Sequence, residues 1–68
     1  MNEETFNISI RKFLKMVGVG SQRDIEQAVQ RALADGRLTG SESFPVRMTL
    51  EAPGLALKVD FDGTIALE

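Results

Sequence analysis

The sequence predicts an α+β domain in which two amphipathic helices precede a three-stranded antiparallel β-meander. Three observations favour this ααβββ order. Apolar residues recur every three or four positions in the first half of the chain, they alternate with polar residues in the second half, and glycine-containing breaks separate the segments. A chain of 68 residues has room for one domain with a small core, so residues 1–68 are expected to form a single unit.

The first helix is expected at about residues 2–17, where apolar residues at helical spacing form one stripe. This stripe consists of Phe6, Ile10, Phe13, Leu14 and Val17. Asn2 can cap the helix, and Glu3 and Glu4 lie where the helix dipole favours negative charge. A strand at residues 5–10 is the alternative, but the longer period of the stripe favours the helix.

A second helix is expected at about residues 22–35. Gly18 and Gly20 predict a break before it, because two glycines weaken a helix and allow positive φ, and Ser21 is a suitable N-cap. The stripe of the second helix consists of Ile25, Ala28, Val29, Ala32 and Leu33. Gly36 can then end the helix in a left-handed conformation.

Alternating apolar and polar residues predict three strands. They are expected at about residues 45–52, 55–60 and 64–67. A turn at Pro53-Gly54 pairs the first two strands, with Leu50 opposite Leu57 on the apolar face and Arg47 opposite Asp60 on the polar face.

The third strand is expected to follow a bulged loop at Phe61-Asp62-Gly63, which places Ile65 on the apolar face opposite Val59. The longest loop of the predicted fold is the stretch from Leu38 to Ser43.

The composition excludes several kinds of site. Cysteine and histidine are absent, which removes disulfides, zinc sites built on these residues, and Cys or His nucleophiles. A net charge of −2 is too mild to indicate a charged partner. No apolar run approaches the roughly 20 residues that span a bilayer, and the acidic N-terminus is unlike a secretory signal. We therefore expect a protein without membrane contact, cofactor or small-molecule ligand, and the lack of cysteine is compatible with the cytoplasm.

The run from Asp60 to Ile65 looks like the nucleophile motif of haloacid-dehalogenase-type phosphatases, in which the first Asp attacks phosphorus and the second serves as acid and base. In those enzymes the motif ends a strand of a parallel sheet, which this pattern does not predict. An EF-hand calcium loop is also not expected, because Lys58 would occupy its first ligand position. The prediction is therefore no catalytic residue, no metal site and no enzyme.

Nucleic-acid binding is the alternative function, because the segment from Phe13 to Leu33 resembles a helix-turn-helix. Phosphate contacts would come from a cluster of cations: Arg11, Lys12, Lys15 and Arg23. Asp24 and Glu26 would face the same phosphates and a third helix is missing, so this alternative is not favoured.

Three apolar residues, Ile8, Met16 and Val19, are left over once the stripes are assigned. They are either partly buried under loops or part of a homodimer surface. Self-association often stabilises a small chain that has no disulfides or metals. The open sheet edges would also permit an element to be exchanged between copies.

Much of the sequence resembles a family of short proteobacterial proteins of unknown function. The resemblance is carried by Ile10-Arg11-Lys12-Phe13-Leu14-Lys15, Val17-Gly18-Val19, Ser21-Gln22-Arg23, Ile25-Glu26, Ala28-Val29 and Gly63-Thr64-Ile65-Ala66-Leu67. It implies a bacterial cytoplasmic protein and favours a domain-swapped dimer, but it implies no activity and no functional residues. The expected function is a non-enzymatic interaction or regulatory module that acts as a homodimer.

Overall fold

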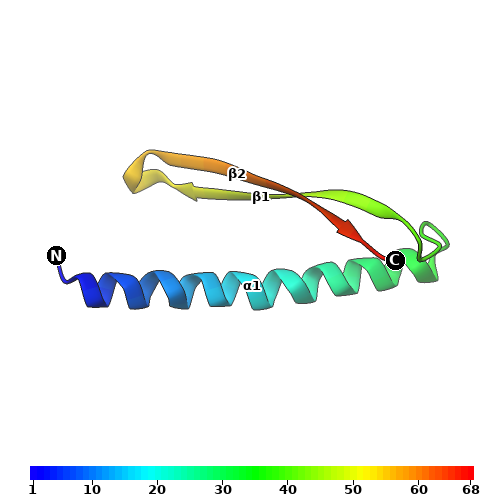
Figure 1. Ribbon diagram of the computed structural model, residues 1–68, viewed down its shortest axis with the longest axis horizontal. Coiled ribbons are helices and arrows are strands. Elements are labelled where there is room, and N and C mark those ends of the chain that lie inside the picture. The colour runs from blue at the N-terminus through cyan, green and yellow to red at the C-terminus, as the bar shows by residue number, and fades with distance from the viewer. The chain divides into compact units, whose positions relative to one another are not determined.

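A computed structural model describes residues 1–68, which fall into two compact units, Met1–Arg37 and Leu38–Glu68. The first unit is one long helix, α1 (Glu3–Ala34), and the second is a two-stranded antiparallel hairpin (Figure 1). The strands are β1 (Ser43–Ala52) and β2 (Leu57–Ala66), joined through a 3₁₀ turn, η1 (Pro53–Leu55). The chain is thus α+β, but the predicted order of two helices and three strands is wrong.

The start of α1 lies where the sequence predicts it. The Oδ1 atom of Asn2 accepts a hydrogen bond from the backbone N–H of Thr5 at 3.0 Å, which satisfies one of the free donors of the first turn. Glu3 and Glu4 follow in that turn, where negative charge favours the helix dipole.

The predicted break at Gly18 and Gly20 does not occur, and α1 continues through both residues for 32 residues in all. A glycine inside a helix costs about 1 kcal/mol relative to alanine, whereas a break leaves up to four N–H and four C=O groups without helical partners. Ser21 is therefore not an N-cap. Its hydroxyl instead donates to the carbonyl of Val17, one turn back, at 2.6 Å.

The end of α1 also follows the prediction. Gly36 has a φ of 76°, and its N–H donates to the carbonyl of Leu33, while the N–H of Arg37 reaches back to the carbonyl of Ala32 at 2.9 Å. These two bonds form a Schellman motif, which satisfies carbonyls of the last turn and requires a left-handed residue after the helix.

Opposite effects are expected from alanine at two glycines of this unit. At Gly18 an added Cβ meets nothing within 4 Å, so Gly18→Ala should stabilise the fold by about 1 kcal/mol. At Gly36 the positive φ should make Gly36→Ala destabilising by about 1 to 2 kcal/mol. Urea unfolding at one protein concentration, followed by circular dichroism, measures both. A loss of stability in Gly18→Ala would show that the helix breaks there.

The hairpin has one apolar and one polar face. Opposite residues on the apolar face pair as Phe44 with Ile65, Val46 with Gly63, Met48 with Phe61, Leu50 with Val59 and Ala52 with Leu57. The polar face carries the remaining pairs, which include Arg47 with Asp62 and Thr49 with Asp60. Each strand keeps the period of two that its sequence predicts, so the assignment of side chains to faces is correct.

The predicted register between the strands is wrong by two residues, since Leu50 pairs with Val59 rather than with Leu57. The connection leaves four residues outside the ladder instead of the two of a Pro-Gly turn. Ala56 closes it in the left-handed region, with a φ of 51°, and donates its N–H to the carbonyl of Pro53. A slip of two residues keeps every side chain on its own face, which explains why the faces were right despite the register.

The predicted turn at Asp62-Gly63 is also absent. β2 runs straight through both residues, and the segment predicted as a third strand is the end of β2, paired with residues 43–45 of β1. The loop predicted from Leu38 to Ser43 therefore ends before Ser43, where β1 begins.

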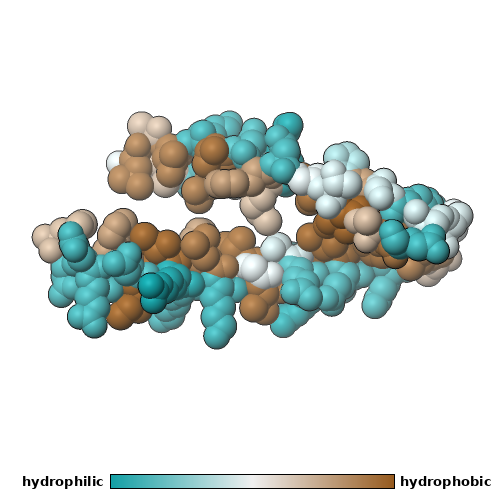
Figure 2. Space-filling model, viewed as in Figure 1, coloured by the Kyte–Doolittle hydropathy of each residue, from teal (hydrophilic) through white to brown (hydrophobic).

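Very few side chains are buried. Only Ala32 is more than nine-tenths buried, and large apolar side chains such as Phe6, Leu14 and Phe61 are half exposed or more. Figure 2 shows brown, apolar side chains at the surface of both the helix and the hairpin. A single helix and a two-stranded sheet each lack a core of their own, so both units present apolar surface that needs a cover.

Candidate self-association surfaces

The three residues predicted for self-association lie on one side of α1. At 100° per residue, Ile8, Met16 and Val19 fall within an arc of about 80°, and Ile8 and Val19 are about 16 Å apart along the axis. Their exposed fractions are 56%, 63% and 53%. We call these three residues the helix patch.

The helix patch lies away from the helix stripe, which we define as the ten apolar residues of the two predicted stripes. In the segment from Phe6 to Val17 the centre of the stripe is roughly 150° around the helix from the patch. One face of a sheet can cover only one side of a helix. A cover for the stripe therefore leaves the patch exposed.

The four cations predicted to contact phosphate also lie on the patch side of α1. Arg11, Lys12, Lys15 and Arg23 fall within about 120° of arc, and no acidic residue occurs between Glu4 and Asp24. All four are exposed. The continuous helix removes the helix-turn-helix geometry on which the nucleic-acid interpretation depended, but it brings the cations together with the apolar patch.

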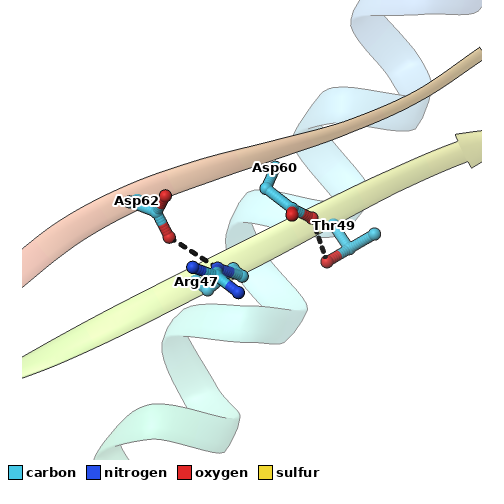
Figure 3. A network of polar contacts seen from close by, with 4 residues as sticks. All are labelled: Arg47, Thr49, Asp60 and Asp62. Carbon is cyan, nitrogen blue, oxygen red and sulfur yellow. Dashed lines mark hydrogen bonds and ion pairs between the residues drawn. The ribbon is translucent and has the colours of Figure 1, made fainter.

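The polar face of the hairpin holds the two aspartates of the phosphatase-like motif (Figure 3). The Nε of Arg47 donates to Asp62 Oδ1 at 2.7 Å, and the hydroxyl of Thr49 donates to Asp60 Oδ1 at 2.7 Å. The side chains of Arg47 and Asp62 are 64% and 63% exposed, so this ion pair contributes little to stability. Each aspartate contacts the residue directly opposite it on β1.

Neither unit holds a group of three or more acidic side chains that could bind a metal ion together. Shallow depressions lie beside Val19 on α1 and beside Pro45 on the hairpin. Both are wide open to solvent, unlike the concave and largely apolar pockets that bind small molecules.

The loop before β1 is held by the carboxylate of Glu42. The N–H of Thr39 donates to both carboxylate oxygens at 3.0 and 2.9 Å, and the N–H of Gly40 donates to Oε1 at 3.0 Å. The carbonyl of Glu42 also accepts the N–H of Leu67, which extends the hairpin ladder by one pair. The backbone N–H of Thr39, followed by that of Gly40, lowers the pKa of Glu42 because these donors stabilise its charged form.

The lowered pKa of Glu42 makes part of the stability depend on pH. The folded state binds this proton more weakly than the unfolded state, so the contribution is present above the ordinary pKa of 4.5 and is lost as the pH falls through the lower, folded value. We expect Glu42→Gln to unfold at lower urea concentration than the wild type at pH 7, and the difference to shrink on acidification below pH 4.5. Urea titrations of both proteins at pH 7 and at a pH below 4.5 measure this difference in stability. A difference that stays constant with pH would contradict this role.

Sequence reasoning assigned the helix stripe and the apolar face of the hairpin to one core, and it missed that the second half of the chain forms only two strands. The missed signal is the unbroken period of two from Leu57 to Ile65, which makes one long strand and leaves only two strands to form a sheet. No predicted site residue proved to be buried.

These features define a small α+β protein with an apolar face on each of its two units. The chain belongs to DUF6494, a family of unknown function whose match covers residues 1–68. No curated protein and no solved structure is detectably similar to it. The resemblance to a family of unknown function is thereby confirmed. No helix combines the length and the apolar composition needed to cross a membrane.

Proposed function

We propose that this protein is a non-enzymatic interaction module that functions as a homodimer, with the helix patch as one of its contact surfaces. The observation that carries the proposal is that neither unit has a core of its own, since one unit is a single helix and the other a two-stranded sheet. Apolar burial is the main favourable contribution to folding, and a lone helix or a lone hairpin buries too little apolar surface to offset its loss of conformational entropy.

A second copy of the chain is a better candidate than another protein to cover the apolar faces of the two units. A chain that cannot bury its apolar residues alone needs its partner whenever it is folded, and an identical chain is always present at the same concentration. Closed homodimers are also the most frequent soluble oligomers.

Sedimentation velocity across a concentration series tests the proposal. We expect a folded dimer of about twice 7.5 kDa at micromolar concentration, with helical structure lost as dilution dissociates it. A folded monomer at every concentration would refute the homodimer.

Nucleic-acid binding is the second candidate, favoured by the run of four cations without an acidic residue between Glu4 and Asp24. The rest of the charge opposes it, because the unit Leu38–Glu68 carries five acidic and two basic residues. A salt-dependent mobility shift of mixed DNA, abolished in Lys12→Glu plus Lys15→Glu, would place this candidate first. The absence of a shift at low salt would remove it.

A further inference from the structure

The backbone groups of the hairpin identify which of its two edges can accept another strand. The N–H of Leu67 donates to the carbonyl of Glu42, the residue directly opposite in the continued register. In antiparallel ladders hydrogen-bonded and non-hydrogen-bonded pairs alternate. The pairs of the apolar face, such as Phe44 with Ile65, are therefore the hydrogen-bonded pairs. The pairs of the polar face direct their N–H and C=O groups away from the hairpin.

The two edges differ at one residue. Along the outer edge of β1 the outward positions include Pro45, which has no N–H to donate. Along the outer edge of β2 the outward positions are Lys58, Asp60, Asp62, Thr64 and Ala66, and every one carries a donor and an acceptor. Proline on an edge strand is a known obstacle to pairing with another chain. β1 is thus the protected edge and β2 the open one.

We propose that the open edge of β2 pairs with β2 of a second copy, antiparallel and around a two-fold axis, to make a four-stranded sheet with the order β1-β2-β2-β1. This inference rests on the homodimer proposed above and names a contact within it. The pairing satisfies the free donors and acceptors of β2. It also joins the two apolar faces on one side of the sheet, because the axis is perpendicular to the sheet.

Charge selects the register of this pairing. If the two-fold axis lies at Asp62, this residue is directly opposite the partner's Asp62. If the axis lies at Phe61, Asp60 is directly opposite the partner's Asp62. Like charges directly opposite each other destabilise a sheet. An axis at Gly63 places Asp62 opposite the partner's Thr64 and avoids every acidic pair. Among the registers without an acidic pair it also gives the longest overlap within β2, residues 60–66.

Gly63 is consistent with this axis. It lies in the middle of β2 with no positive φ, and an added Cβ would meet only Val46 Cγ1 at an ordinary 3.8 Å. Nothing within the hairpin requires a glycine there. Glycine inside a strand often marks the close approach of another backbone, and at the axis Gly63 lies against the partner's Gly63.

Amide hydrogen exchange on the wild-type protein tests the edge without any substitution. Slow exchange is expected for the N–H groups of Asp60, Asp62 and Thr64, and fast exchange for those of Arg47 and Thr49, which point outward from β1. Fast exchange on both edges, or protection of β1 alone, would refute the pairing. If the protein still sediments as a dimer in that case, the homodimer stands and only the edge contact falls.

An NMR contact tests the register. In the Gly63-centred pairing, the Hα atoms of Phe61 and the partner's Ile65 form a close, non-hydrogen-bonded pair. Within one strand these residues are about 13 Å apart, so a nuclear Overhauser effect between them must join two chains. It should appear in a mixed sample of isotope-labelled and unlabelled protein. Its absence from a sample whose β2 amides are protected would refute the register.

A matched pair of proline variants tests the energetic role of the edge. Thr64→Pro removes one outward N–H of β2, opposite Pro45, where the ladder already accommodates proline. Thr49→Pro removes an outward N–H of β1 instead. The dimer dissociation constant should rise about tenfold or more in Thr64→Pro and less than about twofold in Thr49→Pro. Equal effects of the two variants would overturn the proposal.

Discussion

Phe44→Asp is expected to abolish the cooperative unfolding transition of this protein. Phe44 is half-buried on the apolar face of the hairpin, directly opposite Ile65. Loss of a core phenylalanine costs about 3 to 5 kcal/mol, and a carboxylate placed in a surface that must be covered adds a desolvation cost. The total stability of a 68-residue domain is about 3 to 10 kcal/mol, so one such change is comparable with the whole.

The neighbouring residue supplies the control. Ser43 is exposed on the polar face of the same strand, and Ser43→Asp adds the same charge one position away. Its effect should stay within about 0.5 kcal/mol, as is usual for surface substitutions. Urea unfolding and one-dimensional NMR distinguish the two variants. A folded Phe44→Asp protein with wild-type stability would mean that the apolar face of the hairpin is not covered in the native state.

Substitution of the whole helix patch, with Ile8→Ser, Met16→Ser and Val19→Ser combined, is expected to weaken the homodimer about a hundredfold. Two copies contribute six side chains. Even about 0.5 kcal/mol for each, well below the value of a fully buried apolar side chain, amounts to about 3 kcal/mol, which is more than two powers of ten in the dissociation constant. Sedimentation equilibrium across a concentration series measures it.

A second triple variant controls for the lower helix propensity of serine. Asn7→Ser, Gln27→Ser and Gln30→Ser change exposed polar positions of the same helix. This variant should lose some helix stability and retain the wild-type dissociation constant. If the patch variant sediments like the wild type, the patch is not part of the interface, and a contact through the edge of β2 alone would then account for the dimer.

Helical periodicity predicted α1 well except at its centre. Asn2 and Gly36 mark its ends because each makes a specific cap, and caps are local interactions that sequence reports directly. Gly18 and Gly20 misled the prediction because glycine propensity is a local cost of about 1 kcal/mol per residue, while the penalty for ending a helix is collective. No stripe residue lies between Val17 and Ile25, so the apolar pattern itself did not oppose a break there.

The hairpin shows which aspects of a sheet are predictable from sequence. The assignment of Val59 to the apolar face and of Asp60 to the polar face depends only on the period of two, and it was correct. Register and strand number depend on turns, whose signals are weaker. Asp62-Gly63 has the composition of a tight turn, but β2 gains more from continuous pairing with Phe44 and Val46 than a turn could supply.

Among the candidate sites, the helix patch could be proposed from sequence because its members were the apolar residues that neither predicted stripe included. The hydrogen bonds of Glu42 could not be predicted from sequence, because they depend on the backbone conformation of Thr39 and Gly40. The φ of 108° at Gly40 has no signature in the sequence pattern. The open edge of β2 was also out of reach, since the direction of each N–H group follows from the register.

Pro45 has a consequence for how far assembly of this protein can proceed. A hairpin with two open edges behaves as a divalent monomer, and each addition leaves a free end on which a fibre can grow. In the proposed pairing, Pro45 leaves β2 as the one open edge of the hairpin, so the first addition also terminates growth. The missing N–H of Pro45 thereby limits this assembly to a finite oligomer instead of a polymer, although Pro45 itself makes no contact with the second copy.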